Sequence, residues 1–96
     1  MIPSFANQGT EDLFNGVDSK AARKICPPAM TERARRKLEW LDSVVSLHAL
    51  KSAGNALEPL RDDRKGQWAF RINQQYRICF RWEDGNAHDI EVTDYH

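Results

Sequence analysis

The sequence predicts an α+β domain in which a short N-terminal strand and several helices pack on a C-terminal antiparallel sheet. Apolar residues recur at steps of three and four from Met30 to Val45, the spacing of an amphipathic helix. From Trp68 to Trp82 they alternate with polar or small residues, which is the period of half-buried strands. Helices followed by strands are typical of helices layered on one side of an antiparallel sheet. With 96 residues, 41% of them apolar, we expect residues 1–96 to form one domain with a single modest core.

The first part of the chain predicts one short strand and one short helix. Residues 2–5 are suited to the strand. Thr10 is a good N-cap for a helix with acidic residues in its first turn, and Gly16 is suited to end it. A polar connection then leads to Pro27 and Pro28.

The long helix begins at Pro28, since proline is tolerated in the first turn of a helix. Its apolar stripe consists of Met30, Ala34, Leu38, Leu41 and Val45. Ser46 is a suitable N-cap for a further short helix over residues 47–52, which Gly54 and Asn55 end.

Four strands are predicted after the helices. They cover residues 57–60, 67–73, 76–83 and 87–95, with Asp84-Gly85 as a tight turn between the last two. Residues paired across two strands share a face, so the even-numbered apolar residues of the middle strands must pair, which requires an odd-numbered loop or a bulge. The other face carries arginines: Arg71, Arg77 and Arg81. A sheet with one apolar and one arginine-bearing face, ending in His96, predicts a surface that handles phosphates.

The formal net charge is zero, from 14 basic and 14 acidic residues, whereas proteins that bind phosphate chains usually carry an excess of Lys and Arg. The charge is nevertheless polarised along the chain. Residues 20–37 carry seven cations against the single acid Glu32, and residues 83–94 carry five acids with no Lys or Arg. Such a molecule can present a basic surface without being basic overall, and its acidic edge can meet a basic partner.

The composition also argues against a membrane protein, a secreted protein and a metal-binding protein. No run approaches the roughly 20 apolar residues that span a bilayer, and the N-terminus lacks the features of a signal peptide, so we expect a cytoplasmic protein without membrane contact. Cys26 and Cys79 have no metal-ligand spacing and are expected to be packing residues. His48 and His88 are isolated from other ligand residues, so we expect no metal site.

The chain ends with an acid, a phenol and an imidazole: Asp94, Tyr95 and His96. Histidine titrates near neutral pH and can transfer a proton in general acid–base catalysis. On a regular strand Asp94 and His96 share one face and Tyr95 takes the other, unless the chain bends after Thr93. The alternative interpretation is a frayed, solvated tail.

The arginines of the sheet are candidates for binding a phosphate, because a guanidinium stabilises the charge that develops as a phosphodiester is attacked. Arg71 and Arg77 suit this role. The alternative, strongest for Arg81, is a cross-strand ion pair with Asp89 or Glu91.

The loop over residues 60–66 is a second cationic segment. It carries Arg61, Arg64 and Lys65. Glu58 precedes it closely, so Glu58 and Arg61 can serve one site as base and phosphate clamp. A solvated turn with local ion pairs to Asp62 and Asp63 is the alternative.

The long helix carries a third set of cations on one flank: Arg33, Arg36 and Lys37. These residues are candidates for contact with RNA phosphates. A merely solvated stripe is the alternative, and Glu32 can pair with Arg36 at one-turn spacing.

Eight short segments follow one another in an order and at spacings that match a known family. They are Ile2-Pro-Ser-Phe5, Arg33-Ala-Arg-Arg-Lys-Leu38, Leu57-Glu-Pro-Leu-Arg61, Asp63-Arg-Lys-Gly-Gln-Trp68, Arg71-Ile-Asn73, Tyr76-Arg-Ile-Cys-Phe-Arg-Trp82, Asp84-Gly85 and Val92-Thr-Asp-Tyr-His96. Together they resemble the HigB toxins of bacterial type II toxin–antitoxin systems. The resemblance covers essentially the whole chain, and the terminal Asp-Tyr-His is its most specific element.

The resemblance implies a RelE-like fold and an endoribonuclease that needs no cofactor, cuts messenger RNA on the ribosome and so blocks translation. It implies a HigA-like helix-turn-helix antitoxin that neutralises the toxin, with operator DNA bound only through that antitoxin. By the same resemblance, Asp94, Tyr95 and His96 act in catalysis and Arg77 holds the scissile phosphate. The remaining cations are assigned to RNA binding: Arg33, Arg36, Lys37, Arg64, Lys65 and Arg71.

The chain departs from the family at three positions of the cationic loop and the strand before it. Glu58 stands where some members have a histidine, and Arg61 where most have a lysine. Glu58 offers a carboxylate in place of an imidazole, and Arg61 keeps the positive charge but removes any realistic proton transfer. Asp62 replaces a usual glycine. The identity of the second proton-transfer group is therefore open.

Two other functions stay open at this point. A relative of this fold that poisons DNA gyrase by binding has no nuclease chemistry, and the terminal Asp-Tyr-His tells against it. A degenerate toxin retained as an antitoxin-binding co-repressor is favoured slightly by the zero net charge and by the changes at Glu58 and Arg61.

Overall fold

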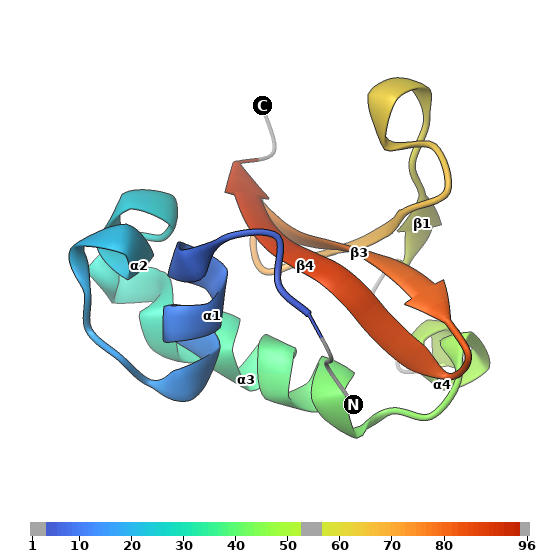
Figure 1. The fold of residues 1–96 in the computed structure, drawn as a ribbon, viewed down its shortest axis with the longest axis horizontal. Helices are drawn as coiled ribbons and strands as arrows, with labels where there is room; N and C mark the ends of the chain where they lie inside the picture. Colours follow the sequence, from blue (N-terminus) through green and yellow to red (C-terminus); the bar gives the residue numbers. More distant parts are fainter. Residues whose placement is uncertain (1–3, 53–56, 95–96) are drawn as a thin grey trace.

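The computed structural model describes residues 4–52 and 57–94, and it confirms the α+β class. Its helical elements are α1 (Gln8–Asn15), α2 (Lys20–Ile25), the 3-10 turn η1 (Pro28–Met30), α3 (Thr31–Ser43), α4 (Leu47–Ser52) and the 3-10 turn η2 (Asp62–Arg64). The strands are β1 (Glu58–Pro59), β2 (Trp68–Arg71), β3 (Tyr76–Glu83) and β4 (Asn86–Asp94). They form one antiparallel sheet in sequential order, with α1, α2 and α3 gathered on one side of it (Figure 1).

The core lies between α3 and the sheet. Ala34, Leu38 and Leu41 are fully buried on α3, as their spacing predicts. They face the even-numbered residues of the sheet, such as Phe70, whose ring meets the Trp40 ring edge-on at 5.7 Å between centroids.

The predicted apolar stripe is wrong at its last member, because Val45 is 81% exposed. The helix ends at Ser43, and Val44 already has an extended backbone, so Val45 no longer follows the helical period. The next predicted cap is confirmed: the Ser46 hydroxyl accepts a hydrogen bond of 3.1 Å from the backbone N–H of Ala49 at the start of α4. The predicted stop at residues 54–55 lies outside the described residues.

Two features of the N-terminal helices differ from prediction. Helix α1 begins two residues before Thr10, because Asn7 is the N-cap and its side chain accepts a hydrogen bond from the Thr10 N–H. Gly16 ends α1 in the left-handed conformation, as predicted (φ 75°). Helix α2 was not predicted, since six residues with only Ala22 buried leave no periodic signal.

The connection between α1 and α2 is held by a carboxylate. The Ser19 hydroxyl, which caps α2 by accepting the N–H of Ala22 (3.0 Å), donates to Asp12 of α1 at 2.7 Å. The Gln8 side chain donates to the other Asp12 oxygen at 2.8 Å. These hydrogen bonds, that of Ser19 first, lower the pKa of Asp12.

The register of the sheet confirms the predicted pairing of even-numbered residues. Trp68 pairs with Phe80, and Phe70 with Ile78. The connection between β2 and β3 also has the predicted odd length, because the last pair joins Arg71 to Arg77 across residues 72–76.

β4 is less regular than predicted. A bulge opposite Phe80, at which Asp89 takes a positive φ of 51°, shifts its register against β3. Before the bulge Ala87 pairs with Trp82, and after it Val92 pairs with Ile78, so both residues are buried on the core side.

The outer edge of β4 is covered by the N-terminal segment rather than by a regular strand. Phe5 forms an isolated parallel bridge with Ile90, whose carbonyl accepts the Ala6 N–H at 2.8 Å and whose N–H reaches the Ser4 carbonyl at 3.3 Å. The structure describes residues 4 and 5 of the strand predicted over residues 2–5, and there it shows this bridge in place of a regular strand.

Both cysteines are buried and free, as expected of packing residues. Burial raises the pKa of the Cys26 thiol. Within residues 4–52 and 57–94, no helix has the length and apolar character needed to cross a membrane.

Candidate active site

The face of the sheet turned away from α3, called the outer face, carries two of the predicted catalytic side chains, Glu58 and Arg77. Strand pairing aligns four residues across it: Glu58, Ala69, Cys79 and Glu91. The neighbouring row consists of Arg71, Arg77 and Thr93. Figure 1 shows the loop around η2 (yellow) extending from the sheet on the side away from α3. The structure therefore brings Glu58 and Arg77 to one face, from strands separated by β2.

Two arginines stand directly opposite each other in this face. Arg71 and Arg77 are paired residues of β2 and β3; Arg71 is exposed, whereas Arg77 is half-buried with a buried Nε. Like charges opposite each other in a sheet repel. Their juxtaposition makes this part of the outer face favourable for an anion, as the prediction of a phosphate-handling surface requires.

Asp94 lies at the end of β4 but on the other face. It pairs with Tyr76, one of the even-numbered residues of the core side, and it accepts a hydrogen bond of 3.2 Å from the Gln75 side chain. Asp94 is thus close to Arg77 along the strands, but the two side chains lie on opposite faces of the sheet. Tyr95 and His96 lie outside the described residues.

The cationic loop between β1 and β2 is a compact turn. It is closed at its base by a hydrogen bond of 2.9 Å from the Leu60 N–H to the Gln67 carbonyl, and η2 forms its tip. Asp62 has a positive φ of 56°, a conformation that glycine adopts at lower cost. The glycine that the resemblance implies at this position therefore has a conformational explanation. Arg61 and Lys65 on either side of η2 are exposed.

Arg64 has a different partner from those expected. In place of Asp62 or Asp63, its guanidinium donates to Glu91 on β4 at 2.9 Å and to Gln67 at 3.1 Å. The turn of η2 directs the Arg64 side chain across the sheet rather than along the loop. Sequence reasoning missed this ion pair because its partners are 27 residues apart and neither carries a local signal.

Arg81 forms the cross-strand ion pair that its position predicts. Its Nε donates to Asp89 at 2.8 Å, and its Nη1 donates to Glu83 at 2.9 Å. The bulge at Asp89 brings that carboxylate beside Arg81, whereas Glu91 is engaged by Arg64.

The cationic flank of α3 is exposed, as expected. Arg33 and Arg36 are exposed and Lys37 is half-buried, and the predicted pair from Arg36 to Glu32 is present at 2.8 Å. At the start of this helix the Asn73 side chain lies 3.5 Å from the Met30 sulfur. This contact places the N-terminal end of α3 beside the β2–β3 connection, at the same end of the sheet as Arg71 and Arg77.

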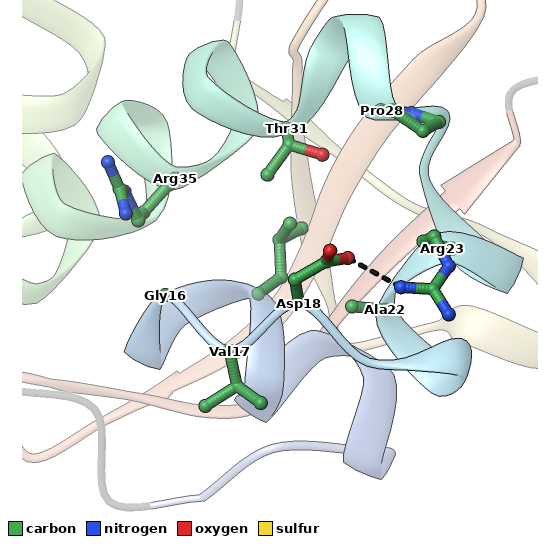
Figure 2. A pocket seen from close by; sticks show the side chains of 9 residues that line it. Gly16, Val17, Asp18, Ala22, Arg23, Pro28, Thr31 and Arg35 are labelled. Atoms are coloured by element: carbon green, nitrogen blue, oxygen red, sulfur yellow. Dashed lines mark hydrogen bonds and ion pairs between the residues drawn. The ribbon is translucent and has the colours of Figure 1, made fainter.

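A separate pocket of about 250 Å³ lies in the helical layer. It is lined by Leu13, Gly16, Val17, Asp18, Ala22, Arg23, Pro28, Thr31 and Arg35. Figure 2 shows the ion pair from Arg23 to Asp18 beside it, at 2.7 Å. Of the residues predicted to act in catalysis or RNA binding that the structure describes, none lines this pocket. In the part of the chain that the structure describes, no three His, Cys, Asp or Glu side chains are grouped so as to hold a metal ion.

Comparison with known proteins places the chain in a class. Residues 3–96 match the model of the HigB-like toxins, described as RelE-like toxins of the type II toxin–antitoxin system HigB. The class is therefore that of the RelE-like toxins. Within it, the chain belongs to the HigB-like toxin family.

Two relatives show the same likeness at the level of sequence. "Endoribonuclease HigB" of Proteus vulgaris is 29% identical over 96 residues, covering 100% of both chains. "Toxin HigB-1" of Vibrio cholerae serotype O1 is 39% identical over 88 residues, covering 91% of this chain and 90% of the relative. Among solved structures, a YoeB/ParE toxin from Agrobacterium tumefaciens aligns over 95% of this chain and 93% of its own, at 17% identity and a TM-score of 0.46.

Proposed function

We propose that this HigB-like toxin is a metal-independent endoribonuclease that cuts messenger RNA on the ribosome and thereby inhibits translation. The observation that carries the proposal is the outer face, where Arg71 and Arg77 stand opposite each other on the same side of the sheet as Glu58. The Proteus vulgaris relative is named as an endoribonuclease, and the match covers the whole of both chains.

The proposed reaction uses the ribose 2′-hydroxyl as nucleophile. The protein has to accept the proton of this hydroxyl, stabilise the extra charge on phosphorus and protonate the leaving 5′-oxygen. His96 carries one proton transfer and Glu58 the other, and Arg77 and Arg61 hold the phosphate. Each proton transfer contributes about 10²- to 10⁴-fold to the rate.

The spacing of the strands suits this division of roles. β1 and β3 are separated by two strand spacings, about 10 Å, which leaves room for a ribose and its phosphate between Glu58 and Arg77. Asp94 lies on the opposite face beside Tyr76, so orienting the end of the chain suits it better than direct contact with the phosphate. Tyr95 stacks on a base or orients it.

The RNA and the ribosome are proposed to approach from the end of the sheet at which α3 begins. The exposed cations Arg33 and Arg36, with Lys37, lie on this helix, and Arg71 at the end of β2 and Lys65 in the loop before it are further exposed cations. Phosphate contacts of this kind give affinity that falls as salt rises.

The proposed partner is a HigA-like helix-turn-helix antitoxin, which neutralises the toxin and through which alone operator DNA is bound. A toxin that cuts messenger RNA has to be held inactive until it is needed, and the family is defined by its toxin–antitoxin systems. We place the protein in the cytoplasm, because its substrate is there.

Expression without antitoxin tests this function. The wild-type protein is expected to stop growth and to cut translated messages at discrete sites, as mapped by primer extension, whereas His96→Ala is expected to do neither. Co-expression of the antitoxin is expected to restore growth. Normal growth with soluble wild-type protein would contradict the proposal, and growth arrest with intact messages and inhibited DNA gyrase would point to a gyrase poison instead.

A further inference from the structure

We propose that Arg64 and Glu91 form a positioning pair that holds the loop of Arg61 over the outer face of the sheet. This inference rests on the proposed nuclease function and deepens it, because it assigns Arg64 to the assembly of the site rather than to RNA contact. It also assigns a role to Glu91, an acidic residue on a face otherwise suited to phosphate.

The contacts of Arg64 are directed inward. Its Nη2 donates to Glu91 at 2.9 Å and its Nη1 to Gln67 at 3.1 Å, so the planar guanidinium is held on one side by β4 and on the other by its own loop. The side chains of Arg64 and Glu91 are 32% and 28% exposed, which makes this the most enclosed of the ion pairs described here. Enclosure reduces screening by solvent and salt.

The pair spans the sheet. Arg64 belongs to the connection between β1 and β2, whereas Glu91 lies on β4, the opposite edge strand. Between them on the outer face lie Ala69 and Cys79, which are 1% and 0% exposed. Small residues in this row leave space for a long side chain to lie across the strands.

The backbone hydrogen bonds of the loop are local. The N–H groups of Arg64, Lys65 and Gln67 donate to carbonyls of the loop itself at 2.9–3.1 Å, and the loop closes through Leu60 and Gln67. These bonds give η2 its shape but relate it only to β1 and β2. The Arg64–Glu91 pair adds the link to β4.

The consequence for the site follows from where the two ends of the pair lie. Arg61 and Glu58 are within six residues of Arg64 on one side, and Glu91 lies three residues before Asp94 on the other. The pair thereby fixes the position of Glu58 and Arg61 relative to the end of β4 at Asp94. Because a displacement of 1 Å in a catalytic geometry can lower a rate by about 10²-fold, loss of this link is expected to affect the chemical step.

The decisive variant is Glu91→Gln, for which the two possible roles of Arg64 predict opposite results. If Arg64 positions the loop, Glu91→Gln lowers the single-turnover rate of cleavage of ribosome-bound mRNA by about 10- to 100-fold with KM unchanged. If Arg64 binds RNA instead, removing a competing carboxylate leaves the rate unchanged or tightens binding.

Further variants test whether the two residues act as a unit. Arg64→Gln and the double variant Arg64→Gln/Glu91→Gln are expected to lose as much as Glu91→Gln and no more, since residues that act together are not additive. Arg64→Lys, which keeps the charge but not the two-sided contact, is expected to lose rate in the same direction. Arg23→Gln is the matched control, because it removes a short but exposed ion pair (2.7 Å, with side chains 49% and 84% exposed) in the helical layer and is expected to leave the rate unchanged.

Amide hydrogen exchange separates this inference from the proposed function. Glu91→Gln is expected to lose protection at Arg64, Lys65 and Gln67 while α3 keeps its protection, whether or not the protein is a nuclease. If the wild type cuts no RNA but the loop loses protection, the proposed function fails and the positioning pair stands. Unchanged exchange in the loop, or additive losses of rate in the double variant, would overturn the positioning pair.

Discussion

Thr10, buried in α1, accepts a hydrogen bond of 3.2 Å from the backbone N–H of Val92 in β4. β4 is an edge strand, which the N-terminal segment covers at Ile90 but not at Val92, and a buried N–H left unpaired costs free energy. A side chain of the first helix thus replaces the partner that a further strand would supply. It does so two residues before Asp94, where the last strand leads into the end of the chain that we propose to be catalytic.

Thr10→Val is expected to lower the free energy of unfolding by about 1–3 kcal/mol, because it keeps the shape of the residue but leaves the Val92 N–H unsatisfied. Thr10→Ser keeps the hydroxyl and loses one methyl group, at a cost of about 0.8 kcal/mol. Urea unfolding followed by tryptophan fluorescence measures both. A valine variant as stable as the serine variant would show that the hydrogen bond contributes little.

Asp12→Asn is expected to change the pH dependence of stability. Hydrogen bonds from Ser19 and Gln8 lower the pKa of Asp12 in the folded protein, so its contribution is fully present above the unfolded pKa, about 3.9. That contribution is lost as the pH falls through the lowered folded pKa. Thermal melts are therefore expected to show wild type above variant at neutral pH and a difference that shrinks below about pH 4. A difference independent of pH would mean that the carboxylate charge is irrelevant.

Glu58→Gln is expected to cut cleavage by about 10²-fold or more if Glu58 carries a proton, since the amide keeps the shape and hydrogen bonding of the carboxylate. Single-turnover cleavage measures the effect, with His96→Ala as reference. A loss of that size in His96→Ala but not in Glu58→Gln would make Glu58 a surface residue that merely occupies the position of the family histidine.

Arg61→Lys distinguishes a simple charge from a two-point grip on the phosphate. We expect partial tolerance, because Arg61 is exposed and the resemblance to the family implies lysine at this position. The same cleavage assay applies. Complete inactivity of a folded variant would show that this branch of the family has rebuilt its phosphate site around arginine.

Reversing Arg33, Arg36 and Lys37 to Glu is expected to weaken association with ribosomes and to reduce its salt dependence, because phosphate contacts are lost. Co-sedimentation over a range of salt concentrations measures this. The matched control reverses Lys20, Arg23 and Lys24 of α2, which changes the net charge equally on a surface with no assigned role. Equal behaviour of the two triple variants would remove α3 from the ribosome-binding surface.

The fold was predictable wherever a periodic pattern was long enough to define a face. The eight residues of β3 follow such a pattern and lie where the sequence places them. The thirteen residues of α3 lie within the predicted helix, but that helix was expected to begin at Pro28, which is instead in the 3-10 turn η1, and to extend to Val45. Helix α2 has six residues with one buried, and the bulge at Asp89 depends on the fit of β4 to β3 and to the N-terminal segment, so neither leaves a local signal.

The sequence predicted on which face of the sheet single residues of the candidate site lie, but not which of these residues contact one another. The alternation of β2 and β3 correctly places Arg71 and Arg77 on the outer face, because parity along a strand is a local property. The ion pair of Arg64 with Glu91 was not predictable, because it depends on how the loop before β2 directs the Arg64 side chain across the sheet toward β4. Which face Tyr95 and His96 occupy stays a prediction.

The parallel bridge between Phe5 and Ile90 can form only late in synthesis, because it joins the first segment of the chain to the last strand. Ser4 and its partner Asp89 are 85 residues apart, so at roughly 5–20 residues per second about 4 to 17 s pass between the emergence of the two segments from the ribosome. Contacts at such separation form late, because the intervening chain has to be ordered first. Until then the edge of β4 is open to other strands, and a helper protein that covers this edge would act in that interval rather than on the finished fold.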